Sequence, residues 1–424
     1  MIRRRPALLA AAALALAACG GGSGTGDGGD TGSISLVLFG DATETGGYTR
    51  MVGAFEAENP DLDVELVPVA KQDDLLARLT TSFAAGTPPD VFLVNTRNYG
   101  RFAEQGALAP VQPYLDDSDV LSADDFYPAA FDAFRAGGDE LQCMPQNLSS
   151  LQVYYNADLF QQAGLEPPRP DWTWAEFLST AQALTRDGVY GVGTEASLIR
   201  LAPFVWSNGG EVVDDPDDPT RLTLTEGASR EAVDFFLDLQ LRHGVAPPER
   251  EEQSEDAETR FLRGGLGMYL DSRKAVPSLR TIEDFTWDVG RLPVAPGGAP
   301  STVLHSDAYC LSREGDPDAG WRLVEFAMSE QGQTLLAESG RTVPSRKDGS
   351  TSPAFLDPEE PPASARGWLD SAEVVRPLPV VPAWSRVEKE GDELLEAVYY
   401  GRTDREEGLR RLEETAADLL QNPG

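Results

Sequence analysis

Carboxylate, amide, hydroxyl and guanidinium side chains follow several apolar runs of this sequence, at the points where strands are expected to end. In open α/β sheets, the residues just past the carboxyl end of a strand face the crevice in which ligands bind. Such side chains supply the hydrogen bonds that a polar ligand needs in place of water. The candidates of this kind are Asp41, Glu44, Asn95, Arg97, Asn98, Gln146, Asn147, Ser149, Asp271 and Arg273. They predict a site that binds a polar small molecule.

Three ring-bearing residues are further candidates for the same site. Trp384 ends the proline-stiffened segment PLPVVPAW, and Trp206 stands just before a glycine pair. Aromatic rings of this kind stack on the apolar faces of ligands, and packing in the core is the alternative for both. His305 precedes an apolar run and could face the ligand, with a structural role as the alternative.

The motifs of common enzyme classes are absent from the sequence. It contains no nucleophile elbow, no P-loop and no dinucleotide-binding glycine motif. With 70 acidic residues, pairs of carboxylates occur at every spacing, so a glycosidase dyad cannot be identified. Two histidines exclude a histidine-rich metal site. We therefore expect no catalytic residue, no metal and no cofactor.

The chain is long and strongly acidic. Its 424 residues are too many for one compact core and enough for two lobes. The formal net charge of −35 repels nucleic acid and anionic lipid, so we expect no polyanionic partner.

The N-terminus has the features of a targeting segment. Three arginines precede a short apolar region, and small residues precede Cys19. The stretch 16–19, LAAC, resembles the lipobox of bacterial lipoproteins, which implies a signal peptide over 1–18 and a lipid on Cys19. An ordinary secretory signal is the alternative. The glycine-rich residues up to 32 are expected to form a flexible tether.

The stretch 84–95, AAGTPPDVFLVN, shows how the predicted elements alternate. A helical apolar pattern before it ends at Gly86, and two prolines prevent its continuation. Residues 91–94 are then continuously apolar, which is typical of a strand buried on both faces. Similar alternation of strand and helix through the chain predicts an α/β fold.

Several motifs resemble one family. AAGTPPDVFLVN followed by FAEQGALAPV (102–111), and YYNADLFQQAGLEPP (154–168) followed by TWAEF (173–177), are similar to extracellular solute-binding proteins of carbohydrate ABC importers. The similarity extends over most of residues 33–420. It implies a two-lobe, type II periplasmic-binding-protein fold, with a mostly parallel sheet in each lobe and the ligand cleft at a multi-strand hinge.

The resemblance also implies domains, partners and location. We expect an N-terminal lobe of residues 33–146 and 302–350 and a C-terminal lobe of residues 147–301 and 351–424. The expected ligand is a mono- or oligosaccharide, and the expected partners are membrane permease subunits. The protein would be a monomer, anchored by Cys19 outside the cytoplasmic membrane. Two alternatives are a carrier of the same fold for a ligand such as a polyamine, and a tethered glycoside hydrolase.

Cys143 and Cys310 remain after processing at Cys19. Both lie in apolar, strand-like stretches of an exported protein, where a disulfide would persist. The alternative is that both are small buried apolar residues. The sequence leaves these possibilities open.

Overall fold

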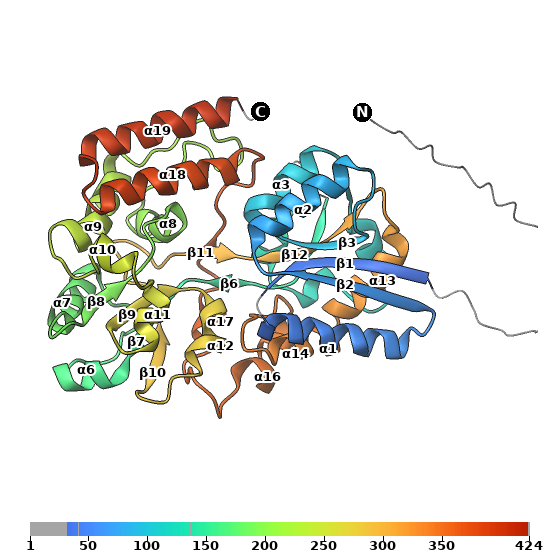
Figure 1. The fold of residues 1–424 in the computed structure, drawn as a ribbon, viewed down its shortest axis with the longest axis horizontal. Helices are drawn as coiled ribbons and strands as arrows, with labels where there is room; N and C mark the ends of the chain where they lie inside the picture. The colour runs from blue at the N-terminus through green and yellow to red at the C-terminus, as the bar shows by residue number, and fades with distance from the viewer. Residues whose placement is uncertain (1–31, 41, 136–137, 139, 423–424) are drawn as a thin grey trace, which may run out of the picture.

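The computed structural model of the chain describes residues 32–40, 42–135, 138 and 140–422. These residues form two lobes joined by a small central sheet (Figure 1). Among the helices of this part of the chain, none combines the length and the apolar character that a membrane span requires. Cys19 and Asp41 lie outside the described residues.

The N-terminal lobe is built around a six-stranded sheet with the order β2-β1-β3-β12-β4, and β5 also pairs with β12. Its strands are β1 (Gly32–Phe39), β2 (Leu62–Val69), β3 (Val91–Asn95), β4 (Leu108–Ala109), β5 (Cys143–Pro145) and β12 (Asp307–Ser312). The helices that accompany it are α1 (Ala42–Glu58), α2 (Gln72–Ala84), α3 (Thr96–Glu104), α4 (Gln112–Asp116), α5 (Pro128–Asp132), α13 (Pro317–Met328), α14 (Glu330–Ala337), α15 (Lys347–Ser350) and α16 (Pro353–Leu356), with a 3₁₀ turn η1 (Ala123–Asp125).

The C-terminal lobe is built around a four-stranded sheet with the order β10-β7-β9-β8. Its strands are β7 (Gln152–Asn156), β8 (Tyr190–Gly193), β9 (Leu266–Asp271) and β10 (Trp287–Gly290). Its helices are α6 (Ala157–Ala163), α7 (Trp174–Leu184), α8 (Leu198–Ser207), α9 (Gly227–Leu241), α10 (Glu249–Glu252), α11 (Ala257–Leu262), α12 (Val276–Leu279), α17 (Gly367–Asp370), α18 (Trp384–Tyr399) and α19 (Arg405–Gln421), with a 3₁₀ turn η2 (Arg273–Ala275).

Both sheets are mixed, whereas the sequence predicted mostly parallel ones. In the N-terminal lobe β1 is parallel to β2 and β3, but β12 is antiparallel to β3, β4 and β5. In the C-terminal lobe only β8 and β9 are parallel, among the pairs that the described residues form. The reason for β12 is the path of the chain, which returns from the C-terminal lobe and enters the sheet in the opposite direction.

A three-stranded hinge sheet lies between the lobes (Figure 1). It contains β6 (Ser149–Ser150), β11 (Thr302–His305) and β13 (Val375–Arg376). β6 is antiparallel to β11, with Ser149 opposite His305, and β13 is parallel to β11. Because β11 continues directly into β12, the hinge sheet is connected without a break to the centre of the N-terminal lobe.

The sequence did not decide whether Cys143 and Cys310 form a disulfide, and in the structure they do. Cys143 and Cys310 lie directly opposite each other on β5 and β12, and their sulfurs are bonded. Both residues are fully buried in the core of the N-terminal lobe. The bond therefore fixes the returning strand β12 to a strand that comes 167 residues earlier in the chain.

The predicted helix end at Gly86 is also confirmed. α2 stops at Ala84, and Gly86 has a φ of +69°, in the left-handed region that favours glycine. The chain then enters β3, all five residues of which are buried. This sequence of helix, turn and strand places Asn95 at the edge of the sheet that faces the hinge.

Candidate ligand-binding site

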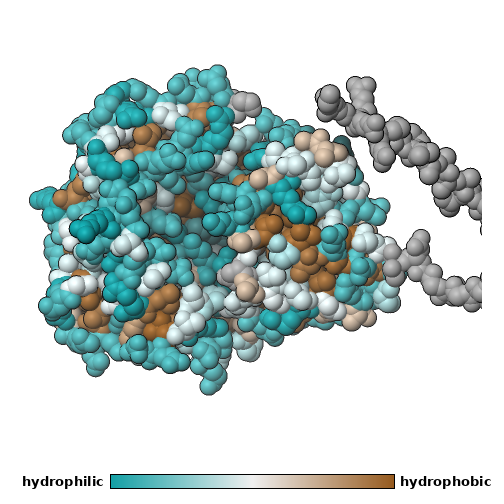
Figure 2. Space-filling view, viewed as in Figure 1, coloured by the Kyte–Doolittle hydropathy of each residue, from teal (hydrophilic) through white to brown (hydrophobic). Residues whose placement is uncertain are grey.

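A cavity of about 310 Å³ lies beside the hinge sheet and is lined by both lobes. Larger hollows of about 850, 540 and 520 Å³ occur on the surface, but each of them is bordered by one lobe alone. Figure 2 shows that one face of the molecule, including the band between the lobes, is mostly hydrophilic. Because a ligand that favours lobe closure must contact both lobes, the hinge cavity is the candidate site.

The lining divides into three parts. The N-terminal wall consists of Phe39, Glu44, Gln72, Asn95, Thr96, Arg97, Asp307, Arg341 and Thr342. The C-terminal wall consists of Glu195, Ile199, Arg200, Ser272 and Lys274. The hinge floor consists of Asn147, Ser149, Leu304, His305 and Ser306.

The charged side chains Glu44, Arg341 and Asp307 of the N-terminal wall contact partners of opposite charge or hydrogen-bonding groups. Arg341 and Glu44 form an ion pair, with Nε 2.6 Å from Oε2, which joins the segment after α14 to the first turn of α1. Asn147 donates from Nδ2 to Asp307 Oδ2 at 3.0 Å and accepts from the Asp307 backbone N–H at 3.2 Å. Burial raises the pKa of Asp307, while the hydrogen bond from Asn147 lowers it.

Arg97 connects the two lobes at the edge of the cavity. It stands in the first turn of α3, and its Nη1 lies 3.4 Å from Oε2 of Glu388 on α18. Burial raises the pKa of Glu388, while Arg97 itself lowers it. The pair therefore spans the boundary between the lobes.

Arg200 dominates the C-terminal wall. It is only 2% exposed, and it stands in α8, a helix whose other residues are almost entirely apolar. Its Nη2 donates to Asp271 Oδ1 at 2.7 Å and lies 3.5 Å from Glu195 Oε2. Lys274 reaches the other oxygen of Asp271, with Nζ 3.5 Å from Oδ2. Burial alone would raise the pKa of Asp271, but Arg200 and Lys274 lower it to about 2.

His305 lies in the hinge floor with a neutral ring. Burial, and then the positive charges of Arg200 and Arg97, lower its pKa well below the ordinary value. Its Nε2 has no hydrogen-bond partner among the described residues. Ser149, opposite it in the hinge sheet, accepts a hydrogen bond from the Arg273 backbone N–H at 3.3 Å.

Six of the residues that the sequence proposed for the site line this cavity, and their roles in binding remain predictions. They are Glu44, Asn95, Arg97, Asn147, Ser149 and His305.

Three other proposed residues lie one layer behind the lining. Asn98 donates from Nδ2 to Asn95 Oδ1 at 2.9 Å, and Gln146 Oε1 accepts from Asn147 Nδ2 at 2.8 Å. Asp271 is buried and contacts the cavity through Arg200. These side chains hold lining groups in place.

The last three proposed residues are packed in the interior. Trp384 is fully buried in the core of the C-terminal lobe, because it is the first residue of α18 rather than part of the segment before it. Trp206 is buried, with the Arg376 guanidinium 4.7 Å from its ring centre. Arg273 lies between the rings of Phe355 and Trp368, and burial lowers its pKa to about 9.

The sequence candidates did not include five charged residues of the lining, namely Glu195, Arg200, Lys274, Asp307 and Arg341. One signal was present for Arg200, which is the single charged residue in the apolar run LIRLAPFVW (198–206). A charge in such a helix must find a partner or a ligand, because burying it alone is costly. The other four residues lie in turns, in a loop or at the start of a strand, and their sequence surroundings carry no comparable signal.

Metal binding has no support in the described part of the chain, where no three His, Cys, Asp or Glu side chains are grouped to hold an ion. The cavity lining provides carboxylate, amide, hydroxyl and guanidinium groups for hydrogen bonds. Its apolar side chains are those of Phe39, Ile199 and Leu304.

The sequence is similar to those of known binding proteins. A binding protein of Brucella abortus is 24% identical over 412 residues, which cover 92% of this chain and 94% of that protein. The sn-glycerol-3-phosphate-binding periplasmic protein of Agrobacterium fabrum is 25% identical over 300 residues, covering 66% of this chain and 67% of that protein.

Solved structures show the same fold. An ABC substrate-binding protein of Listeria monocytogenes, in complex with cycloalternan, superposes with a TM-score of 0.84 at 23% identity and covers 92% of this chain and 100% of that one. The family profile described as "Bacterial extracellular solute-binding protein" matches residues 41–334. The chain therefore belongs to the bacterial extracellular solute-binding proteins.

Proposed function

We propose that this solute-binding protein is the carrier of an ABC importer and that its ligand is a carbohydrate or a related polyol. The observation that carries the proposal is the hinge cavity, which both lobes line with hydrogen-bonding side chains. Hydroxyl-rich ligands need many such partners, because each buried hydroxyl left without one weakens binding. The Listeria protein named above was solved with a carbohydrate, and the Agrobacterium relative is named for a polyol phosphate.

Binding would act through closure of the lobes. Thr96 and Asp307 line one wall and Arg200 and Ser272 the other, so a ligand touching all of them favours the closed form. The hinge sheet would bend while each lobe keeps its own packing. The closed form would then be the one recognised by the permease subunits.

The proposed location of the protein comes from the N-terminal sequence. Cys19 would carry a lipid that anchors the protein outside the cytoplasmic membrane, with the glycine-rich residues that follow as a tether. The carrier would act as a monomer and perform no chemistry on its ligand.

A polyamine fits this cavity less well than a carbohydrate. Four cationic side chains line it, namely those of Arg97, Arg200, Lys274 and Arg341. A polycation would be repelled by them, although Glu44, Glu195 and Asp307 are also present.

The test is thermal unfolding of the purified protein against a panel of sugars, polyols, polyamines and amino acids. A ligand that binds only the folded state stabilises it by about 2.7 kcal/mol at a hundredfold excess over its dissociation constant. We expect a rise in the midpoint with one class of sugar or polyol and no product after incubation. A rise with a polyamine alone would refute the carbohydrate assignment, and turnover of a glycoside would refute the carrier assignment.

A further inference from the structure

The C-terminal wall of the cavity holds a buried guanidinium whose hydrogen-bonding capacity is only partly used. Arg200 Nη2 donates to Asp271, but Nε and Nη1 are buried and have no partner among the described residues. A guanidinium carries five N–H donors and cannot lose its charge under ordinary conditions. Three of these donors, one on Nε and two on Nη1, therefore have no partner among the described residues, and Arg200 is part of the cavity lining.

Asp271 cannot take up the remaining donors, because its own oxygens are occupied. Oδ1 accepts from Arg200 and from the Ser272 backbone N–H at 2.6 Å. Oδ2 accepts from the Tyr269 hydroxyl and lies 3.5 Å from Lys274 Nζ. One carboxylate is thus shared by two cations, and one positive charge on this wall lacks a buried counter-charge.

Glu195 is the other acidic group near Arg200, and it compensates only weakly. Its Oε2 lies 3.5 Å from Arg200 Nη2, but its side chain is 65% exposed, so water screens its charge. The neutral ring of His305 adds no charge, and its Nε2 offers one more unused polar atom.

The other cations of the cavity are already matched. Arg341 is bonded to Glu44, and Arg97 is paired with Glu388. The uncompensated positive charge is therefore concentrated at Arg200 and Lys274, in a protein whose net charge is −35. A ligand at this wall would therefore meet a local positive charge, although the chain as a whole is strongly negative.

From this arrangement we infer that the ligand is an acidic carbohydrate or polyol, with one carboxylate or phosphate group held by Arg200 and Lys274. The inference rests on the proposed function and specifies its substrate class. Arg200 would donate a charge-assisted hydrogen bond to the acidic group from one of its nitrogens that has no partner within the protein. The hydroxyls of the same ligand would face the N-terminal wall.

Binding of matched acidic and neutral ligands tests the inference. Galacturonate against galactose, and glycerol 3-phosphate against glycerol, differ by the acidic group, and titration calorimetry gives each dissociation constant. We expect the acidic member of at least one pair to bind about tenfold or more tightly than its neutral partner. The pair that responds distinguishes a carboxylate from a phosphate.

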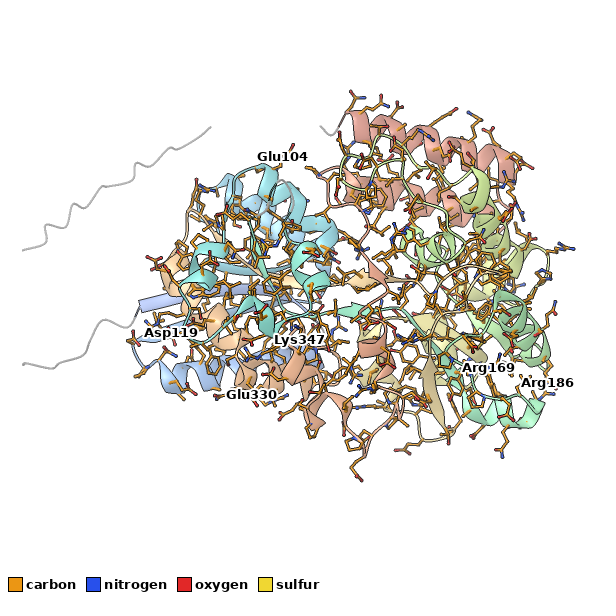
Figure 3. The ribbon with its side chains drawn as sticks, turned by 180° about the vertical axis from the view of Figure 1, so that it is seen from behind. Glu104, Asp119, Arg169, Arg186, Glu330 and Lys347 are labelled. Atoms are coloured by element: carbon orange, nitrogen blue, oxygen red, sulfur yellow. A yellow bond between two sulfur atoms is a disulfide. The ribbon has the colours of Figure 1, made fainter. Side chains whose placement is uncertain are left out.

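The variant Lys274→Gln sharpens this test without a risk to folding, because its side chain is 43% exposed. It should weaken binding of the acidic ligand about tenfold, and it should weaken binding of the matched neutral ligand clearly less. Arg186→Gln is the matched control, since it also removes one positive charge but lies at the outer end of the C-terminal lobe (Figure 3). It should change neither affinity.

A double variant, Arg200→Gln with Asp271→Asn, removes the buried pair without leaving a lone buried charge. It should weaken the preference for acidic ligands, because only Lys274 remains to bind the acidic group. Equal or tighter binding of the neutral member in every pair, or an equal loss of both in Lys274→Gln, would overturn the inference while the proposed function stands. Failure of all carbohydrates and polyols to bind would overturn both.

Discussion

The two walls of the cavity differ in how their charges are neutralised. On the N-terminal wall, Glu44 and Arg341 form an ion pair, and Asp307 exchanges two hydrogen bonds with Asn147. On the C-terminal wall, Arg200 has one strong bond to Asp271 and two nitrogens without a partner. The main charges of the first wall are paired without a ligand, whereas the second wall holds a buried guanidinium with donors that have no partner among the described residues.

The largest difference between the two walls is expected when one acidic group is removed from each and the loss of stability is compared. Asp271→Ala leaves Arg200 charged and buried, so we expect the free energy of unfolding to fall by about 3 to 5 kcal/mol. Glu44→Ala should cost only about 1 kcal/mol, because Arg341 is 19% exposed and can turn to water. Urea unfolding of both variants measures the difference, and equal losses would contradict it.

The pH dependence of stability tests the buried acids near the C-terminal wall. Asp392 accepts from the Leu198 N–H at the start of α8, and burial raises its pKa from 3.8 to about 7. Between these values the folded protein keeps a proton that the unfolded chain releases. The free energy of unfolding should therefore fall as the pH rises from about 4 to 7, with a contribution from Asp392 of about 2 kcal/mol after allowance for its partial exposure.

The variant Asp392→Asn isolates this contribution, because an amide oxygen can still accept from the Leu198 N–H. Its stability should vary less with pH over the same range, and it should exceed the stability of the unmodified protein most at pH 7 to 8. An unchanged slope in urea unfolding curves at several pH values would show that Asp392 is ionised in the folded protein.

A smaller effect on the free energy of unfolding is expected for a change at the packing contact between the lobes near Arg97. A Cβ on Gly100 of α3 would lie 2.8 Å from the carbonyl oxygen of Val380, in the segment before α18. Gly100→Ala should lower the free energy of unfolding by about 1 to 2 kcal/mol. Gly53→Ala in α1 is the control, since its Cβ would meet nothing within 4 Å, and it should stabilise by up to about 1 kcal/mol. A change of the same sign in both variants would refute this packing.

The smallest effect is expected for the ion pair between the lobes. Arg97→Gln removes the contact with Glu388, but the arginine is 30% exposed, so stability should change by less than about 1 kcal/mol. The more sensitive readout is the radius of gyration of the free protein, which should rise if the pair holds the lobes together. An unchanged radius would assign the pair to the surface alone.

Much of the fold could be predicted from local sequence signals. The end of α2, the turn at Gly86 and the buried strand β3 follow from glycine, proline and an unbroken apolar run within one short stretch. The orientation of β12 could not be predicted in this way, because it depends on the path of the chain between lobes.

The site was harder to predict because a residue's type does not fix where its side chain points. Asn95 and Asn147 line the cavity because they stand at strand ends, as expected. Arg273 stands just after a strand as well, but its side chain turns into the interior between two rings. Arg200 is far from any strand end and faces the cavity from a helix that otherwise looks like core.

The most direct test of the account is hydrogen–deuterium exchange of the protein with and without the ligand that most raises its unfolding midpoint. The account predicts slower exchange of amides on both walls together, in residues 95–97 and 304–307 and in residues 195–200 and 272–274. Protection on one wall alone, or protection confined to the surface hollow lined by Arg322 and Thr334, would contradict a site between the lobes.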